Sequence, residues 1–510
     1  MNRMIDTDFE VVVCGAGPVG LLLACELRLR GVTVAVVERL TEPDTTIKAG
    51  AINTPTAEAL YRRGLLPELA AAQERNLERF RSFLASRGVD APRKAPPKFA
   101  GHFAGLMMSA EHFDQDDPAF AGHGPAGDVG MVNQQDMESI LDEWARRLGV
   151  TVRRGTALTG LTDHGDAVTA ETSAGPLRAR WLVGCDGGRS TVRRLAAFDF
   201  PGTDPEITGH QAIVEMEGAE RLGGGWNTTP TGIYANGPFP GRILTVELDG
   251  PPADRDAPIT AAELEAGLRH VSGVDVTITD VHSATRFTDN ARQATTYRKG
   301  RILLAGDAAH VHSPFGGQGL NLGIGDAFNL GWKLAATLQG WAPAGLLDTY
   351  TAERHPIGAW VLDWSRAQVA LMRTDERSRA LRGIVHDLLS TTAGTTYAVK
   401  QISGVWHRYD LPGDHDLVGR SAPDLALADG SALADHLHDG RALLLDLAGR
   451  ADLREAADAY RDRAAVVSAK SPDTDVDGLL VRPDGVVAWA GADMQGLTAA
   501  LAAWLGAPSR

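Results

Sequence analysis

The chain has 510 residues, 44% of them hydrophobic, which is enough to build a large core divided between two or three domains. Its formal net charge of −15 argues against nucleic acid or an anionic membrane surface as the main partner, because both attract clustered lysine and arginine. The three cysteines are too few for a disulfide framework and show no zinc-binding spacing.

The N-terminal residues predict a cytoplasmic protein. Asp6, Asp8 and Glu10 precede the first apolar run, which is the opposite of a signal peptide, and no apolar segment is long enough to span a bilayer. We therefore expect a soluble protein without a membrane or nucleic-acid partner. It should act on a small molecule, as a monomer or homodimer.

The first forty residues predict a dinucleotide-binding βαβ unit. An apolar strand at 11–14 leads into a turn, which precedes a helical stretch at 21–30 and a second strand at 32–37 that ends at Glu38. The turn carries the motif GxGxxG at Gly15, Gly17 and Gly20. The glycines allow a pyrophosphate onto the helix N-terminus, and the acid accepts hydrogen bonds from ribose hydroxyls. The motif by itself does not separate FAD from NAD.

The next part of the chain is less regular. A loop of small residues at 48–56 leads into an amphipathic helix over 57–66. The segment 75–130 is rich in Phe, His, Gly and Pro and shows no sustained period, so we expect strands and loops that contribute to a second layer. Gln134 then precedes a helix over 138–148.

Two further strand ends carry an acid next to a glycine. An apolar strand at 181–184 leads to Asp186 and Gly187, in the same form as the opening stretch. Residues 302–305 predict a buried strand followed by the turn Gly306-Asp307. The glycines that follow leave the backbone bare for a close neighbour; they are Gly316, Gly317 and Gly319. A flat or phosphorylated ligand should lie against this stretch.

The region from 200 to 298 predicts a mainly antiparallel sheet, because strand-like pieces at 211–216, 242–247 and 274–281 are joined by Gly and Pro turns. Several aromatic or apolar residues could line a substrate pocket, with core packing as the alternative for each. These substrate candidates are Met107, Trp226, Tyr234, Phe239 and Phe315.

The rest of the chain predicts helices and then a small separate α/β domain. The expected helices lie at 327–338, 344–354 and 357–372. From about 415 the pattern alternates between strands and helices, which suggests a domain of its own. The expected elements are a strand at 442–447, a helix at 452–460, strands at 479–482 and 486–489, and a helix at 495–505.

Three fingerprints together resemble the FAD-dependent aromatic hydroxylases of the para-hydroxybenzoate hydroxylase fold, the group A flavin monooxygenases. They are GxGxxG at 15–20, Cys185-Asp186-Gly187 and Gly306-Asp307. The C-terminal region, which has no cysteine, resembles the thioredoxin-like domain of aromatic polyketide hydroxylases and larger phenol hydroxylases. The implied fold is α/β (α+β). Its parts are a Rossmann-like FAD-binding domain (1–190 and 299–400), an inserted substrate-binding sheet domain (75–130 and 191–298) and a thioredoxin-like domain without redox cysteines (415–510).

The resemblance also implies roles for individual residues. Glu38 would bind the adenosine ribose, Gln134 the flavin chain and Asp307 the ribityl chain. Lys48 stands where many members have an arginine beside the flavin, and Pro55 replaces another common arginine. The implied FAD-binding residues are Gly15, Gly17, Gly20, Glu38, Arg39, Lys48, Gln134, Asp186, Gly187, Gly306, Asp307, Pro314, Gly316, Gly317, Gly319, Leu320 and Asn321. The candidate catalytic residues are Lys48, Pro314, Gly317 and Asn321.

The implied reaction is aromatic hydroxylation. NADPH or NADH would reduce FAD, molecular oxygen would add to the flavin C4a, and the hydroperoxide would pass one oxygen atom to an electron-rich ring, here expected to belong to a multi-ring polyketide of antibiotic biosynthesis. The alternatives are a smaller phenol or phenylpropionate, Baeyer-Villiger oxygenation, or a flavin-binding protein that does not oxygenate. We expect no metal, because His310 and His312 lie in no HxxxH motif or carboxylate cluster.

Overall fold

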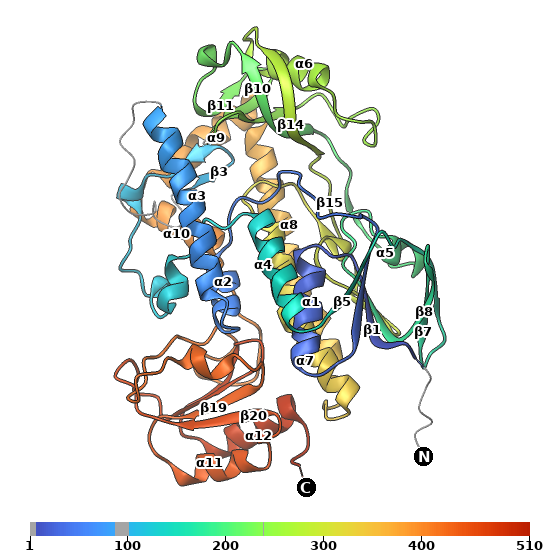
Figure 1. Ribbon diagram of the computed structural model, residues 1–510. Coiled ribbons are helices and arrows are strands. Elements are labelled where there is room, and N and C mark those ends of the chain that lie inside the picture. The colour runs from blue at the N-terminus through green and yellow to red at the C-terminus, as the bar shows by residue number, and fades with distance from the viewer. Residues whose placement is uncertain (1–6, 87–100, 238, 510) are drawn as a thin grey trace.

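The computed structural model describes residues 7–86, 101–237 and 239–509. Figure 1 shows three bodies: a central sheet with long helices, a second sheet at the top, and a C-terminal unit at the bottom. Residues 87–100 of the predicted segment 75–130 lie outside the described residues.

The central sheet has eight strands, and its parallel strands end at one edge. The order along its main path is β16-β17-β8-β1-β2-β5, and the hairpin of β6 and β7 extends from β8. The strands are β1 (Phe9–Cys14), β2 (Val34–Glu38), β5 (Thr151–Arg154), β6 (Leu158–Asp163), β7 (Val168–Thr172), β8 (Gly175–Gly184), β16 (Arg298–Lys299) and β17 (Ile302–Leu304). Strand β1 pairs in parallel with β2 and β8, and β17 pairs in parallel with β8. The carboxyl ends of β1, β2, β8 and β17 therefore lie side by side, which brings all three fingerprints together.

Long helices cover this sheet. Helix α1 (Pro18–Leu29) packs against α4 (Gln134–Arg147) and α7 (Gly319–Gln339). Covering is required on both faces, because Val11, Val12 and Val13 of β1 are fully buried. None of the helices in the described ranges combines the length and the apolar character needed to cross a bilayer.

Helix α8 (Thr349–Met372) corrects the prediction of two helices at 344–354 and 357–372, because it runs unbroken through Pro356. A proline inside a helix removes one backbone hydrogen bond and is usually read as a break. Here the buried residues Tyr350 and Arg354 before the proline and Ile357 and Val361 after it continue one packed face. Tertiary packing outweighs the local preference.

The second sheet is antiparallel throughout, with the order β11-β12-β13-β10-β14. Its strands are β10 (Thr208–Glu217), β11 (Gly225–Thr229), β12 (Gly232–Asn236), β13 (Arg242–Glu247) and β14 (Thr277–Phe287). Helix α6 (Ala261–Ser272), which was not predicted, covers one face through Leu264 and Leu268. The other face points toward the loop between β17 and α7, which carries Gly316 and Gly317 and which we call the second glycine loop. Leu244 of the sheet and Phe315 of this loop share a buried cluster.

The expectation of strands and loops over 75–130 is wrong at its start. Helix α3 spans Leu66–Ser86, with Leu69, Ala72 and Asn76 buried at helical spacing. Most of its charged residues are exposed, but Asn76 is a polar residue on the buried face, which obscures the apolar period in the sequence. Strands appear only as the short pair β3 (His102–Phe103) and β4 (Leu106–Met107).

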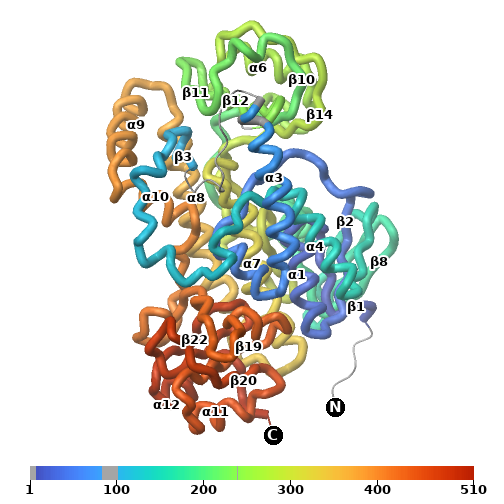
Figure 2. Tube along the Cα trace, turned by 60° about the vertical axis from the view of Figure 1, so that its left-hand side comes forward, coloured from blue at the N-terminus to red at the C-terminus, as the bar shows by residue number. Residues whose placement is uncertain are grey.

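The C-terminal unit is a four-stranded mixed sheet with two helices, as the thioredoxin resemblance implied (Figure 2). The strand order is β20-β19-β21-β22, with β19 and β20 parallel and the other pairs antiparallel. Its elements are β19 (Ala442–Asp446), α11 (Ala451–Asp458), β20 (Ala464–Ser468), β21 (Gly478–Val481), β22 (Val487–Ala490) and α12 (Met494–Leu505). Only β20 was not predicted.

A buried ionic cluster joins the C-terminal unit to the long helices. Arg482 donates to both carboxylate oxygens of Glu353 at 3.0 and 2.8 Å, and Lys333 of α7 lies 2.9 Å from the same carboxylate. Asp484 accepts a further hydrogen bond from Arg482 at 2.5 Å. Burial lowers the pKa of Lys333 to about 7, and it acts to raise that of Glu353, but Arg482 and Lys333 hold the Glu353 pKa well below its usual value. The cluster therefore depends on the Glu353 carboxylate.

The three cysteines are free and lie in packed surroundings. Cys14 and Cys25 are buried. Cys185 is half-buried beside the GxGxxG turn at 15–20, which we call the first glycine loop. Burial raises the pKa of all three thiols well above the usual value. They behave as small core residues, as the sequence predicted.

Replacing Glu353 by glutamine is expected to lower the free energy of unfolding by about 3–5 kcal/mol, because the Arg482 and Lys333 charges stay buried with one counter-charge fewer. Chemical denaturation of wild type and variant, followed by tryptophan fluorescence, measures the difference. The matched control on the same helix is Asp363→Asn, whose exposed ion pair with Arg366 should contribute less than about 1 kcal/mol. Equal losses from both variants would contradict a junction that depends on Glu353.

Candidate active site

The glycines of the first loop divide between close packing and open backbone. A Cβ on Gly15, whose φ is +108°, would lie 2.3 Å from the Cys185 carbonyl oxygen, and one on Gly20 would lie 2.0 Å from the Gly15 oxygen. A Cβ on Gly17 would meet no described atom within 4 Å, and within the described residues no side chain caps the start of α1. The outer glycines let β1, β8 and α1 approach one another. The middle one presents backbone beside a helix N-terminus, which suits a pyrophosphate.

Glu38 ties the end of β2 to the first glycine loop. One of its carboxylate oxygens accepts a hydrogen bond from the Ala16 amide at 2.8 Å, and the other accepts from the Leu40 amide at 2.8 Å. The carboxylate therefore stands at the edge of the loop, where the sequence placed a ribose. The Arg39 side chain is exposed next to it.

Asp186 has a structural partner that the sequence did not reveal. Its carboxylate accepts hydrogen bonds from the Thr191 amide at 2.6 Å and from Ser190 Oγ at 2.5 Å, and so caps helix α5 (Thr191–Leu195). At Gly187, whose φ is +78°, a Cβ would meet no described atom within 4 Å. The open part of this motif is thus the glycine backbone, and the carboxylate holds the turn in place.

The second glycine loop joins β17 to α7. Asp307 is exposed although residues on both sides of it are buried, and its carboxylate has no hydrogen bond or ion pair with any described residue. Pro314 and Gly317 are exposed, whereas Phe315 and Leu320 are buried and anchor the loop. Within the part of the chain that the structure describes, a Cβ on Gly317 would face open space, and no side chain caps the start of α7. A Cβ on Gly319 would face His312 and Asp307, and Gly316, with φ +86°, packs on Gln368.

A buried carboxylate, Asp326, fixes the second glycine loop to α7 and α8. It accepts from the Gly306 amide at 3.0 Å, from His310 Nε2 at 2.7 Å and from Arg354 Nε at 2.8 Å. Burial acts to raise the pKa of Asp326, but His310 and Arg354 outweigh it and keep the pKa below its usual value. The sequence argument missed Asp326. Its signal was a charged residue within the apolar pattern of a helix, where a charge is rarely buried unless it is paired.

Asn321 links the second glycine loop to the start of α2 (Thr54–Tyr61). Its Oδ1 accepts from the Asn53 amide at 2.9 Å, and its Nδ2 donates to the Gly317 carbonyl at 3.0 Å. Pro55 lies in the first turn of α2, where a proline needs no amide hydrogen. Asn321 therefore holds two loops at a fixed separation.

Gln134 is the first residue of α4, and Lys48 lies on the loop that contacts the start of this helix and the second sheet. The Gln134 backbone amide donates to the Ala49 carbonyl at 2.9 Å, while its side chain donates to Glu138 at 2.9 Å. Lys48 Nζ forms an ion pair with Asp44 at 2.8 Å and is about two-fifths exposed. The Lys48 side chain is therefore partly exposed to solvent, and its charge is paired with the Asp44 carboxylate.

The second sheet presents aromatic residues toward the second glycine loop. Phe315 of the loop makes edge contacts with Trp226 and Phe287 of the sheet, at centroid distances of 6.5 and 5.8 Å. Trp226 also packs on His102 at 4.2 Å, and burial lowers the pKa of His102 to about 4. Trp226 and Phe315, two of the predicted substrate residues, are thus brought together between loop and sheet.

The other three predicted substrate residues lie elsewhere. Tyr234 points to the opposite face of the sheet, where it packs in the α6 cluster and accepts a hydrogen bond from the Gly223 amide at 3.2 Å. Its strand neighbour Ala235 pairs with Trp226, so alternation sends Tyr234 the other way. Met107 is 63% exposed, and Phe239 is half-buried in the turn between β12 and β13.

Arg242 on the inner face of the second sheet was not predicted. It is half-buried, one of its guanidinium nitrogens lies 3.9 Å from the position of a Gly50 Cβ, and it has no ion pair among the residues described. Burial lowers the pKa of Arg242.

His310 is fully buried against Asp326, and His312 Nδ1 lies 2.6 Å from the Ser313 carbonyl oxygen. Across the described ranges, no group of His, Cys, Asp and Glu side chains could hold a metal ion.

Comparison with known proteins gives two family matches that together cover most of the chain. A model described as "FAD binding domain" matches residues 8–365, and one described as "Aromatic-ring hydroxylase, C-terminal" matches residues 415–508. The chain is 41% identical to rifampicin monooxygenase from Streptomyces venezuelae, over 98% of this chain and 99% of that protein. It is 38% identical to dialkyldecalin synthase from Streptomyces rugosporus, over 97% and 98%.

A solved structure agrees with these matches. The OxyS anhydrotetracycline hydroxylase from Streptomyces rimosus superposes with a TM-score of 0.84 and 38% identity, covering 98% of this chain and 100% of that one. The fold, the order of the three fingerprints and the family models give one answer. The chain belongs to the family of FAD-dependent aromatic-ring hydroxylases, which are flavoprotein monooxygenases.

Proposed function

We propose that this chain hydroxylates a multi-ring aromatic compound in the space between the second glycine loop and the inner face of the second sheet. The observation that carries the proposal is the position of Phe315. It belongs to the loop that carries the bare glycines, and it contacts Trp226 and Phe287 of the sheet. An aromatic wall and an open backbone therefore share one space, as a flat substrate beside a flat cofactor requires.

The residues present fit FAD. Gly17 offers open backbone at the start of α1 for the pyrophosphate, and Asp307 offers an exposed carboxylate without a partner in the described structure for the ribityl hydroxyls. When bound, FAD supplies the redox chemistry: it accepts a hydride from NADPH or NADH and activates molecular oxygen. The α7 amides near Leu320 and Asn321 would stabilise negative charge at the adjacent ring. Pro314, Gly317 and Lys48 would border that ring.

Named relatives support the substrate class. One is a rifampicin monooxygenase, and another is an anhydrotetracycline hydroxylase. We propose a multi-ring polyketide here by analogy with them, and a cytoplasmic protein that is a monomer or homodimer. The dialkyldecalin synthase relative favours a second candidate, a flavin-binding protein that acts on its ligand without oxygenating it.

Oxygen uptake separates the two candidates. We expect multi-ring phenols to accelerate both NADPH oxidation and oxygen consumption by the FAD-loaded protein, with a product heavier by one oxygen atom in mass spectrometry. Single-ring phenols should act more weakly. If ligands perturb the flavin spectrum but no compound of either size stimulates oxygen uptake, the result would contradict hydroxylation and support the non-oxygenating candidate.

Asp307→Ala is expected to yield mainly apoprotein, because it removes a carboxylate placed to accept hydrogen bonds from the ribityl chain. The ratio of visible flavin absorbance to protein absorbance after purification measures retention. Asp387→Ala, which removes an exposed carboxylate on α9 (Glu376–Leu389), should keep full flavin. Full retention by Asp307→Ala would count against this assignment.

Trp226→Ala is expected to raise KM for a multi-ring substrate about tenfold, because it removes one wall of the aromatic contact. The matched control is Tyr234→Phe, on the neighbouring strand but the opposite face, which should leave KM unchanged. Steady-state kinetics with the best substrate of the panel decides between them. An equal effect of the two variants would place the substrate elsewhere.

A further inference from the structure

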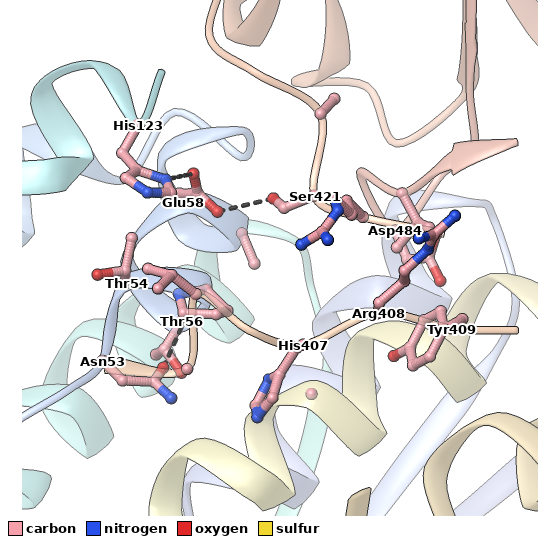
Figure 3. A pocket seen from close by; sticks show the side chains of 18 of the residues that line it. Asn53, Thr54, Thr56, Glu58, His123, His407, Arg408, Tyr409, Ser421 and Asp484 are labelled. Carbon is pink, nitrogen blue, oxygen red and sulfur yellow. Dashed lines mark hydrogen bonds and ion pairs between the residues drawn. The ribbon is translucent and has the colours of Figure 1, made fainter. Parts of the chain in front are cut away.

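A cavity lies at the junction between the long helices and the C-terminal unit (Figure 3). Its volume is about 420 Å³. Its walls come from α2, the first half of α7, residues 354 and 357 of α8, and the segments 118–123, 404–423 and 484–486. We name it the junction cavity. Asn53 and Asn321 line its side nearest the second glycine loop.

The Glu58 carboxylate in the wall of the junction cavity already has hydrogen-bond and charge partners. Glu58 is buried, lies 2.7 Å from His123 Nδ1 and accepts a hydrogen bond from Ser421 Oγ at 2.7 Å (Figure 3). Arg62 lies 3.9 Å from the same carboxylate. Burial acts to raise the pKa of Glu58, but Arg62 and His123 hold it below its usual value. This carboxylate therefore has no need of a cationic ligand.

Positive charge at the cavity wall is left without a counter-charge. Arg408 and Arg420 both line the cavity and are exposed, and each donates its Nε–H to a backbone carbonyl, of Val418 and Asp416. Neither guanidinium has a carboxylate partner in the described ranges. The other charged groups of the wall are matched, since Arg354 pairs with Asp326 and Asp484 pairs with Arg482.

Apolar side chains form a large part of the remaining lining, and one buried polar atom there has no partner among the described residues. The apolar residues are Ile324, Phe328, Ile357, Val405, Leu417 and Val486. His407 lines the same cavity, and its buried Nε2 has no hydrogen-bond partner among the described residues. Burial lowers the pKa of His407 to about 3, so the ring is neutral at pH 7.

We propose that the junction cavity binds a small organic anion with an apolar body, separate from FAD and from the aromatic substrate. The guanidinium forks of Arg408 and Arg420 match a carboxylate or a phosphate, and the apolar wall takes the remainder of the molecule. The volume falls in the range of roughly 300–1,000 Å³ that small-molecule pockets occupy. The anion could come from a carboxylic acid or from a phosphate ester such as a pyridine nucleotide.

The test uses the FAD-loaded full chain and the fluorescent probe 8-anilinonaphthalene-1-sulfonate, which joins an anionic group to an apolar body. We expect saturable binding of one equivalent, measured by fluorescence and by calorimetry. The double variant Arg408→Met with Arg420→Met should weaken binding at least tenfold. Arg461→Met, an exposed arginine of the C-terminal unit whose partner is Asp458, is the control and should bind as wild type. Unchanged binding by the double variant would overturn the proposal.

A second variant guards against misfolding, and competitors identify the anion. Val405→Trp fills the cavity and should abolish probe binding, while flavin content and the unfolding midpoint stay at the wild-type level. Displacement of the probe by 1-naphthoate would indicate a carboxylate ligand, and displacement by NADP⁺ a phosphate ligand. Displacement by neither, or full binding by the Val405→Trp protein, would contradict a site for an organic anion in this cavity.

Discussion

One buried carboxylate, Asp326, sets the geometry on which the active site depends. Its two oxygens accept hydrogen bonds from the Gly306 amide, His310 and Arg354. These bonds connect the turn after β17 and the short segment at His310 to the helices α7 and α8. A buried charge is tolerated only when such partners surround it, and each partner is then held in place in return. The exposed Asp307 and the bare glycines that follow owe their positions to this arrangement.

Helix α8 connects that arrangement to the C-terminal unit. Arg354 turns toward Asp326, while its neighbour Glu353 turns toward Arg482 and Lys333. Consecutive residues of one helix thus belong to two buried ionic groups, one beneath the second glycine loop and one at the junction. The C-terminal unit contains no cysteine and so has no dithiol chemistry. Through Arg482 it contacts Glu353 of α8, which also pairs with Lys333 of α7.

Short-range patterns were predictable from the sequence, and pairings were not. The β1-α1-β2 unit follows from glycine spacing and a terminal acid, and β13 appears at 242–247 as expected. The role of Asp326 depends on Arg354, which lies 28 residues further along the chain. The hydrogen bonds of Asp186 are local, to Ser190 and Thr191, but they depend on the exact conformation of the turn, which residue spacing does not specify. The separation of Trp226 from Tyr234 depends on strand register, since one residue of shift reverses the face. The residues that would bind FAD and substrate stay predictions, although the structure brings the three fingerprints to one sheet edge.

The packing of the three cysteines has a practical consequence. Thiolates are the reactive form, and burial keeps the Cys14, Cys25 and Cys185 thiols protonated. A maleimide should therefore label the native protein slowly. A cysteine introduced on the exposed surface of the C-terminal unit would react selectively, without removal of the natural three. Because the natural thiols react slowly, a spectroscopic reporter could be attached selectively to a cysteine introduced beside the junction cavity.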